Sequence, residues 1–293
     1  SNSSWNPNGI TFADINTIGI NPQDIFINTN NTVYVPNQEK GQIVVLSEGS
    51  ATPTRIISGD LTNPFSLFVT TSGDIYVDAY DSIGGVSKWI SISNTFVVVT
   101  NVEQKCMSLF VDIDNNLYCS MAYSHRVVKK LLDNNPATLT TVAGTGSYGS
   151  SSNMLYGPHG IFVDINFDLY VADTYNHRIQ LFRYGVSNGI TVAGKGSSTT
   201  TITLNSPTGI VLDADGYLFI VDSLNNRIVG SGPNGFRCLV GCSGLASSAA
   251  NQFNQPQSLS FDSYGNMFII DVGNNRIQKF VLSTNLCSKY QNI

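Results

Sequence analysis

The stretch Pro158-His159-Gly160-Ile161-Phe162-Val163 opens the clearest of six similar units in this 293-residue chain. A polar turn at 164–168 follows it, and residues 169–172 then form a second run of strong β-formers. Alternating residues at 178–182 predict a third strand, and residues 189–194 are predicted to form the fourth. No segment of the unit has a sustained apolar period of 3.6 residues, so we expect four strands and no long helix.

The opening strand recurs along the whole chain at intervals of 42 to 52 residues. Its six copies begin at Pro22, Pro64, Cys106, Pro158, Pro207 and Pro256. This interval is the one expected of four-stranded propeller blades. The sequence therefore predicts an all-β, six-bladed β-propeller of four-stranded antiparallel blades, built as a single domain over residues 1–293.

The ends of the chain indicate how the ring closes. The sixth repeat supplies only three strands, the last of them at 276–282, whereas Gly9-Ile10-Thr11-Phe12-Ala13 reads like the fourth strand Gly189-Ile190-Thr191-Val192-Ala193. We expect residues 9–14 to complete blade six by pairing with 276–282. Such pairing covers an edge that would otherwise be open to association.

Repeats four to six share the pattern Asp-x-x-Asn-x-Arg between their second and third strands. Asn tolerates the left-handed backbone of a tight turn, and the Arg can fork back onto the Asp carboxylate. The predicted structural pairs are Asp173 with Arg178, Asp222 with Arg227, and Asp271 with Arg276. Repeat three has Met121 where the Asp should be, and repeats one and two have Asn37 and Ala79 there.

Asn176-His177-Arg178-Ile179, set between Pro158 and Val192-Ala193-Gly194, resembles the NHL-repeat family. The resemblance is fullest in repeats four to six and weaker in the first three. It implies a six-bladed propeller. Some NHL propellers bind RNA through a basic face, but the 15 Lys and Arg residues here are scattered and the net charge is −5. We therefore expect no nucleic-acid partner.

The residues that open the innermost strands are expected to lie near the central axis, where propellers bind ligands. These six candidate ligand-binding residues are Gln23, Phe65, Met107, His159, Thr208 and Gln257. The alternative is that they only plug the axial channel. Asp24 follows Gln23, and strand alternation predicts that its side chain points away from the ring.

Known propeller enzymes match this axial ring poorly. Amidating lyases that resemble NHL propellers hold zinc with His residues from several blades, and here only Pro158-His159 matches that pattern. His125 and His177 fall at hairpin corners and are expected to be structural surface residues. The ring carries no acid for calcium. We expect no metal, cofactor or catalytic residue, with a hydrolase or lyase that uses an axial pocket around His159 as the alternative.

Five cysteines cannot all pair with one another. Cys238 and Cys242 are predicted to form a disulfide because Gly241 lets the chain between them bend, and this bond favours an oxidising compartment. Cys119 takes a position held by buried Val or Ile in the other repeats, and Cys106 is expected to be poorly placed to reach it. Cys287 has no evident partner.

Asn, Ser, Thr and Gly supply most of the polarity, which is typical of extracellular proteins. Asn2 and Asn30 are candidate glycosylation sites, and no apolar run is long enough to span a bilayer. Long connections at 145–157, 195–206 and 242–255 are expected on the face of the disc that carries the axial ring. The sequence favours a secreted, non-enzymatic module that binds a protein, or a glycan or small molecule, on this face.

Overall fold

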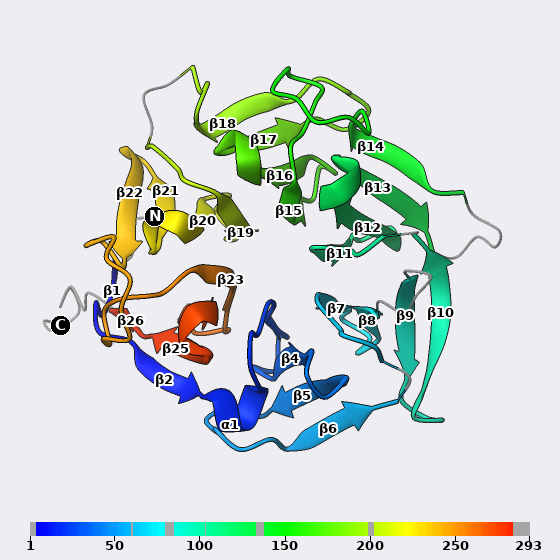
Figure 1. Ribbon diagram of the computed structural model, residues 1–293, viewed down its shortest axis with the longest axis vertical. Helices are drawn as coiled ribbons and strands as arrows, with labels where there is room; N and C mark the ends of the chain where they lie inside the picture. The colour runs from blue at the N-terminus through cyan, green and yellow to red at the C-terminus, as the bar shows by residue number, and fades with distance from the viewer. Residues whose placement is uncertain are drawn as a thin grey trace, which may run out of the picture.

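Six four-stranded antiparallel sheets surround one central axis in the computed structural model (Figure 1). The structure describes residues 4–59, 61–79, 85–102, 104–132, 138–198 and 202–283. The predicted all-β, six-bladed propeller is therefore confirmed. Within the described ranges, no helix is long and apolar enough to cross a membrane.

The first three blades are continuous in sequence. Blade one contains β3 (Phe26–Ile27), β4 (Val33–Asn37), β5 (Gln42–Leu46) and β6 (Arg55–Ser58). Blade two contains β7 (Leu67–Val69), β8 (Ile75–Asp78), β9 (Gly85–Ile90) and β10 (Thr95–Asn101). Blade three contains β11 (Leu109–Val111), β12 (Asn116–Met121), β13 (Arg126–Leu131) and β14 (Thr140–Gly144).

Blades four and five repeat this order, and blade six takes its outer strand from the start of the chain. Blade four contains β15 (Pro158–Val163), β16 (Leu169–Asp173), β17 (Arg178–Phe182) and β18 (Ile190–Gly194). Blade five contains β19 (Pro207–Leu212), β20 (Leu218–Asp222), β21 (Arg227–Gly232) and β22 (Gly235–Val240). Blade six contains β23 (Pro256–Phe261), β24 (Met267–Asp271), β25 (Arg276–Phe280) and β2 (Ile10–Ala13).

The core lies between neighbouring blades. The middle residue of each second strand is at most 2% exposed, because both faces of every sheet are covered by the adjacent sheets. These equivalent residues are Val35, Val77, Cys119, Val171, Ile220 and Ile269. Burial on both faces explains why the second strands read as continuous apolar runs.

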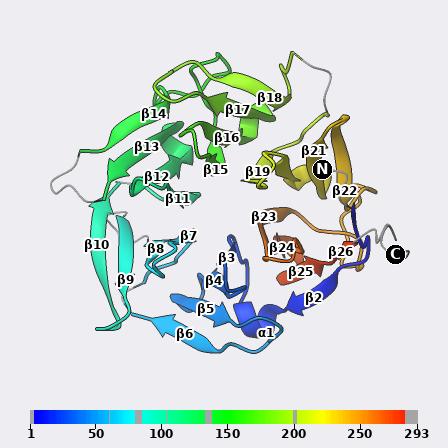
Figure 2. The ribbon, with the colours of Figure 1, turned by 180° about the vertical axis from the view of Figure 1, so that it is seen from behind.

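The two ends of the chain pair twice, as Figures 1 and 2 show. β2 pairs with β25, with Ile10 opposite Lys279 and Ala13 opposite Ile277, which confirms the predicted closure. A second pairing was not predicted: β1 (Ser4–Trp5) lies antiparallel to β26 (Leu282–Ser283). The N-terminal segment therefore makes two contacts. Its strand β2 completes blade six, and its strand β1 pairs with β26, which follows β25.

Trp5 anchors this second pairing between blades five and six. Its ring is 8% exposed and meets Phe219 edge-on, with ring centroids 5.7 Å apart. A further ring, that of Phe261, lies 6.1 Å away, and Trp5 Nε1 donates a hydrogen bond to Gly265 O at 2.8 Å. A buried indole with its N–H satisfied contributes both apolar burial and specificity.

Short helical turns occupy the corner between the second and third strands of four blades, and α1 (Ile15–Ile18) follows β2. The 3₁₀ turns are η1 (Ala122–Ser124), η2 (Thr174–Asn176), η3 (Ser223–Asn225) and η4 (Val272–Asn274). The residue that caps each turn is left-handed, with φ between 49° and 56°. These caps are His125, His177, Asn226 and Asn275.

The prediction that the motif Asn takes the left-handed conformation was therefore wrong by one position. Asn176, Asn225 and Asn274 are the last residues of their 3₁₀ turns, so the change of backbone hand falls on the next residue. Each motif Asn instead donates its side-chain amide to the motif carboxylate at 2.8–2.9 Å.

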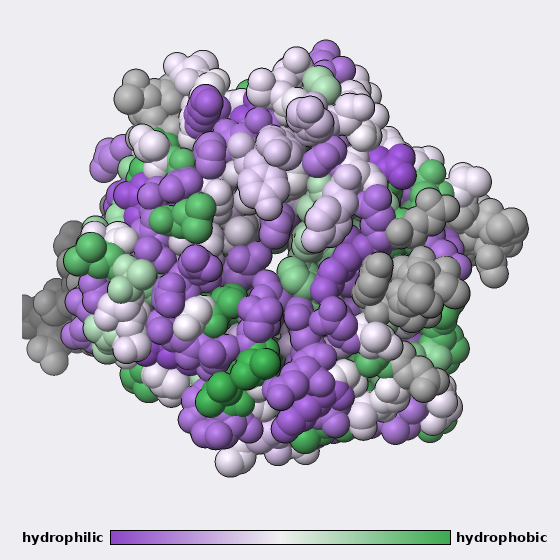
Figure 3. All heavy atoms as spheres, in the orientation of Figure 1, coloured by the Kyte–Doolittle hydropathy of each residue, from purple (hydrophilic) through white to green (hydrophobic). Residues whose placement is uncertain are grey.

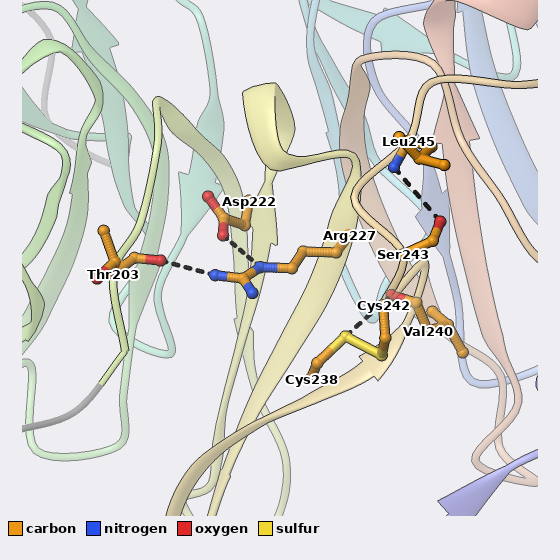
Figure 4. The surroundings of a disulfide bond; sticks show 8 residues. All are labelled: Thr203, Asp222, Arg227, Cys238, Val240, Cys242, Ser243 and Leu245. Atoms are coloured by element: carbon orange, nitrogen blue, oxygen red, sulfur yellow. Dashed lines mark hydrogen bonds and ion pairs between the residues drawn. A yellow bond between two sulfur atoms is a disulfide. The ribbon is translucent and has the colours of Figure 1, made fainter.

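Each motif Asp joins three parts of the chain. Asp222 is fully buried and accepts hydrogen bonds from Arg227 Nε at 2.7 Å and from the backbone N–H of Asn205 at 2.7 Å. Arg227 Nη2 in turn donates to Thr203 O at 2.7 Å (Figure 4). Equivalent pairs join Asp173 to Arg178 at 2.7 Å and Asp271 to Arg276 at 2.8 Å. The hairpin and the loop that arrives from the preceding blade are thus tied to one carboxylate.

Two disulfides are present. The predicted Cys238–Cys242 bond lies at the end of β22, with Cα atoms 5.8 Å apart (Figure 4). Cys106 and Cys119 form the second, with Cα atoms 5.2 Å apart, so the expectation that Cys106 is poorly placed to reach Cys119 was wrong.

The cause of this error is a local shift of register. Leu109 lies opposite Cys119 as expected, but ahead of it the N–H of Met107 donates to Ser120 O at 2.9 Å. The chain therefore bulges before β11, as it does before the corresponding residues of blades four to six. The bulge displaces Cys106 toward Cys119.

The glycosylation candidates and the last cysteine fall in different parts of the chain. Asn30 is exposed in the turn between β3 and β4. Asn2 and Cys287 lie outside the described residues.

Deletion of residues 1–14 tests the closure. The deletion removes β1 and β2, and loss of a buried Trp side chain alone costs about 3–5 kcal/mol. We expect the melting temperature to fall by roughly 10–20 °C, since a large domain loses about 2–4 °C per kcal/mol. The variant Trp5→Ala separates the two pairings and should account for only part of the fall. An unchanged thermal melt of the deletion variant would rule out the closure.

Replacement of Asp222 by Ala tests the motif carboxylate. The variant leaves the Arg227 guanidinium and the N–H of Asn205 without their acceptor, and we expect the free energy of unfolding to fall by about 3–5 kcal/mol. Asp215→Ala, in an exposed turn of the same blade, is the matched control and should change it by less than about 0.5 kcal/mol. Equal urea midpoints for the two variants would argue against the role of Asp222.

Candidate functional site

Five of the six predicted axial residues line a cavity on the central axis. The cavity has a volume of about 140 Å³, and the five residues are Gln23, Met107, His159, Thr208 and Gln257. Figure 3 shows the hollow at the centre of the disc. Phe65 is not among the lining residues, and the Lys105 ammonium lies 4.2 Å from the centroid of its ring. The inner strands thus bring five of the predicted side chains together.

The polar residues of this cavity are bonded to one another. Gln257 Nε2 lies 3.2 Å from His159 Nδ1, and Thr208 Oγ1 donates to Gln257 O at 2.8 Å. Burial lowers the pKa of His159 to about 4, so the ring is neutral at pH 7. The Thr208 hydroxyl donates to a carbonyl and not to the imidazole, so no base activates it as a nucleophile.

Asp24 also faces the cavity, although strand alternation predicted the opposite orientation. The regular strand begins only at Phe26, so the alternation does not apply to Asp24. Its Oδ1 accepts a hydrogen bond from Ser258 Oγ at 2.7 Å, and its Oδ2 accepts one from the N–H of Leu67 at 3.1 Å. The carboxylate therefore bridges blades six, one and two.

Four phenylalanine rings line the cavity below the polar residues. Neighbouring ring centroids are 5.0–5.1 Å apart, and each ring comes from a different blade. The four are Phe26, Phe68, Phe110 and Phe162. Blades five and six place Val211 and Ser260 at the same level. The cavity thus has a polar mouth on the loop face and an apolar floor.

The long connections between blades lie on the loop face, which is the face that carries the 3₁₀ turns and the polar mouth. Arg178 holds the loop 145–157 through three backbone carbonyls at 2.9–3.1 Å, those of Ser150, Ser151 and Met154. Arg276 holds the loop 242–255 in the same way, through Ser248 O, Ala249 O and Gln252 O at 2.7–3.1 Å. These loops are therefore fixed in shape by the blade that follows them.

Three tyrosines and one histidine gather on this face; we call Tyr148, Tyr156, Tyr175 and His125 the tyrosine patch. The ring centroids of Tyr148 and Tyr156 are 5.4 Å apart, and those of Tyr156 and Tyr175 are 5.0 Å apart. His125 meets the first two rings edge-on at 5.7 and 5.5 Å. Tyr148 and Tyr175 remain 68% and 54% exposed. Tyr148 and Tyr156 lie on the long loop 145–157, which was expected on this face, whereas Tyr175 and His125 come from the corners of blades four and three. Their contact with the loop depends on the packing of two blades, so the sequence alone did not predict it.

His125 and His177 link adjacent blades, which agrees with the structural role expected of them. His125 Nδ1 accepts a hydrogen bond from the N–H of Gly157 at 3.2 Å, and His177 Nδ1 accepts one from the N–H of Ser206 at 3.0 Å. Asn226 and Asn275 make the equivalent bonds in the next two blades, to the N–H groups of Gln255 and Asn21.

The arrangement offers no metal site in the described part of the chain. No three His, Cys, Asp or Glu side chains among those residues lie close enough together to hold an ion. His159 is the one imidazole that lines the axial cavity. The described residues provide a small polar pocket on the axis and, on the same face of the disc, an exposed aromatic surface.

The titration of Asp24 gives a test of the axial geometry. Burial raises the pKa of Asp24 from 3.8 to about 6, against the lowering effect of its hydrogen bonds. The folded state then holds this proton more tightly than the unfolded state, so the stability that Asp24 contributes is greatest below pH 4 and is lost as the pH rises through 6. Asp24→Asn does not titrate.

We therefore expect the free energy of unfolding of the wild type, minus that of Asp24→Asn, to fall by up to about 3 kcal/mol between pH 4 and pH 7. Urea unfolding at the two pH values measures it. Asp215→Asn, at an exposed turn, is the control and should show no comparable change. A difference that stays constant with pH would contradict the buried position of Asp24.

Comparison with known proteins supports the repeat assignment. The family model of the NHL repeat matches residues 155–182, which contain β15, β16, η2 and β17 of blade four. No curated protein matches the chain. The match covers the first three strands of blade four, one of the three blades that contain the motif Asp, Asn and Arg.

Solved structures share the fold at low identity. A structural genomics protein of unknown function from Bacteroides thetaiotaomicron superposes with a TM-score of 0.74 at 16% identity, over 94% of this chain and 76% of the other. An auxiliary nutrient binding protein from the same organism gives 0.67 at 15% identity, over 90% and 69%. Virginiamycin B lyase from Staphylococcus aureus gives 0.62 at 13% identity, over 93% and 98%.

At these identities the likeness extends to the fold alone. The six sheets, the motif corners of blades four to six and the family match over 155–182 agree with one another. The chain is a six-bladed β-propeller that contains an NHL repeat at residues 155–182.

Proposed function

We propose that this propeller is a non-enzymatic extracellular module that binds a partner protein through its loop face. The observation that carries the proposal is the exposed tyrosine patch, in which Tyr148 and Tyr156 stand on a loop that the buried Arg178 holds in place. A binding surface of this kind needs no ordering when the partner arrives, so less of the contact energy is lost on association.

Tyrosine is suited to this role because it offers a large ring and a hydroxyl at the cost of few rotatable bonds. Tyr148 and Tyr175 expose most of their side chains, and Tyr156 between them is 40% exposed. Aromatic residues and tyrosine in particular are enriched at interface centres. Three such rings in mutual contact form a continuous surface rather than isolated apolar residues.

The small size of the axial cavity favours the tyrosine patch over this cavity as the binding site. Its volume of about 140 Å³ is below the range of roughly 300–1,000 Å³ that small-molecule sites occupy. The hydrogen bonds among His159, Gln257 and Thr208 occupy much of its polar capacity. A partner that touches the tyrosine patch would meet only the rim of this cavity.

Two further observations agree with the proposal. The disulfides Cys106–Cys119 and Cys238–Cys242 favour an oxidising, extracellular environment, and Asn30 is accessible for glycosylation. Some proteins of the same fold are described as auxiliary nutrient binding proteins, so the fold is used for binding.

The alternative function is that of a hydrolase or lyase with His159 at its centre. It is favoured by the shared fold of virginiamycin B lyase, which this chain covers over 98% of its length. Activity that is abolished by His159→Ala, together with stoichiometric metal in the purified protein, would support the enzyme and contradict the binding module.

The binding module is tested by capture from the native extracellular fluid with a double variant, Tyr148→Ala with Tyr175→Ala. Loss of two exposed aromatic contacts should weaken the complex at least tenfold, since hot-spot residues contribute about 1–2 kcal/mol or more each. Proteins captured by the wild type are identified by mass spectrometry, and the purified pair is then measured by calorimetry.

Tyr264→Ala is the matched control, because Tyr264 is 62% exposed in the turn between β23 and β24, on the face opposite the loops. It should bind the partner as the wild type does. Equal affinity of the loop-face double variant and the wild type would refute the proposed surface.

A further inference from the structure

Blades three and four enclose a second cavity on the face opposite the loops. Its volume is about 380 Å³, which falls within the range of small-ligand sites. It lies between the ends of β12 to β14 and the turn that follows β17, and its lining includes Tyr118, Lys129, Thr140, Thr141, Phe167 and Tyr184. The axial ring and the tyrosine patch contribute none of these residues.

Phe167 breaks the pattern of the repeats at this cavity. It has a left-handed backbone with φ of 63°, in the turn between the first two strands of its blade. The equivalent residues of the other five blades have φ between 57° and 84°, and all are Gly or Asn: Asn31, Gly73, Asn115, Gly216 and Gly265. A bulky ring in this conformation carries a conformational cost that Gly and Asn avoid. In blade four the residue with this unfavourable backbone conformation, Phe167, is also one that lines the cavity.

Phe167 forms an aromatic wall with Tyr184. The two ring centroids are 5.7 Å apart, and Tyr184 is 66% exposed. The N–H of Tyr184 donates to Asp168 Oδ1 at 3.0 Å, which fixes the start of the turn that carries the ring. The wall is thus held in place by the backbone while its outer ring faces solvent.

The charges around the cavity are largely compensated. Arg183 forms an ion pair with Asp168, which is buried beside it. The Lys129 ammonium lies 5.9 Å from the ring centroid of Tyr118 and 5.8 Å from that of Tyr184, so it is held over two aromatic faces. The exposed side chains of Thr140 and Thr141 add neutral hydroxyls.

From these observations we propose that the cavity between blades three and four binds a neutral sugar ring. A pyranose has an apolar C–H face that stacks on the electron-rich face of an aromatic ring, and Phe167 and Tyr184 supply such faces. Its hydroxyls accept hydrogen bonds from the Lys129 ammonium and exchange them with the threonine hydroxyls. Arg183 is not free to bind an anionic group of a ligand, because Asp168 already neutralises it.

The test is a binding screen of the full chain against neutral oligosaccharides of glucose, galactose, mannose and xylose, followed by calorimetry with the sugar that binds best. We expect at least one of these sugars to bind. We also expect Tyr184→Ala and Phe167→Gly each to weaken it by tenfold or more. Phe167→Gly should melt no lower than the wild type, because five blades have Gly or Asn there, so its loss of binding does not reflect unfolding.

Two variants serve as controls. Tyr264→Ala, on the same face but in blade six, should bind the sugar like the wild type. The loop-face double variant, Tyr148→Ala with Tyr175→Ala, should also bind it, which separates this site from the proposed protein-binding surface. The inference is overturned if no neutral sugar binds, if the bound sugar is indifferent to Tyr184→Ala, or if only charged ligands compete for the cavity.

Discussion

The buried carboxylate at the corner of blades four to six is the interaction on which the loop face depends. Asp173, Asp222 and Asp271 are fully buried, and burial of a charge is costly unless it is paired and hydrogen-bonded. Each carboxylate meets that condition with an arginine, an asparagine amide and a backbone N–H. Burial still raises the pKa of Asp173, so desolvation outweighs these contacts in that case.

Arginine at this corner does what lysine could not. The Nε of Arg178 and Arg276 binds the carboxylate, and their two terminal nitrogens reach three carbonyls of the incoming loop. A planar group with five donors can serve both sides at once, whereas an ammonium offers a single point of charge. The same contact therefore closes a hairpin and shapes the surface on which the tyrosine patch stands.

Blades one to three lack this corner and use other contacts. In blade one Asn37 Oδ1 accepts a hydrogen bond from the N–H of Lys40 at 3.1 Å. In blade two Asp78, one residue before the corner, accepts one from the N–H of Cys106 at 3.0 Å, and burial raises its pKa to about 7. Blade three adds the Cys106–Cys119 disulfide. Blades four to six therefore share one corner contact, whereas blades one to three each use a different one.

The sequence alone predicted the six blades and five of the residues that line the axial cavity, because both follow from the repeat period. It was insufficient wherever a contact depends on a local departure from regular strands. The disulfide of Cys106 required a bulge that the spacing does not reveal, and Asp24 faces the axis because its strand starts late. Trp5 belongs to a two-residue strand, which is too short to show any pattern. Phe167 did carry a signal, because it stands where the other turns have Gly or Asn, and an alignment of the turns would have found it.

Because the six blades repeat one pattern, a residue that differs from its equivalents in the other blades is informative. Such residues are of two kinds. Asp24 replaces the Ser or Gly of other blades, yet each of its oxygens is bonded to a neighbouring blade, so it is explained by the closure of the ring. Phe167 also breaks the repeat, and it lines a cavity instead of bonding to a neighbouring blade. A side chain whose cost is not offset by contacts within the fold needs a contact outside it. That distinction assigns Asp24 to stability, and it is the ground on which we propose a binding role for Phe167.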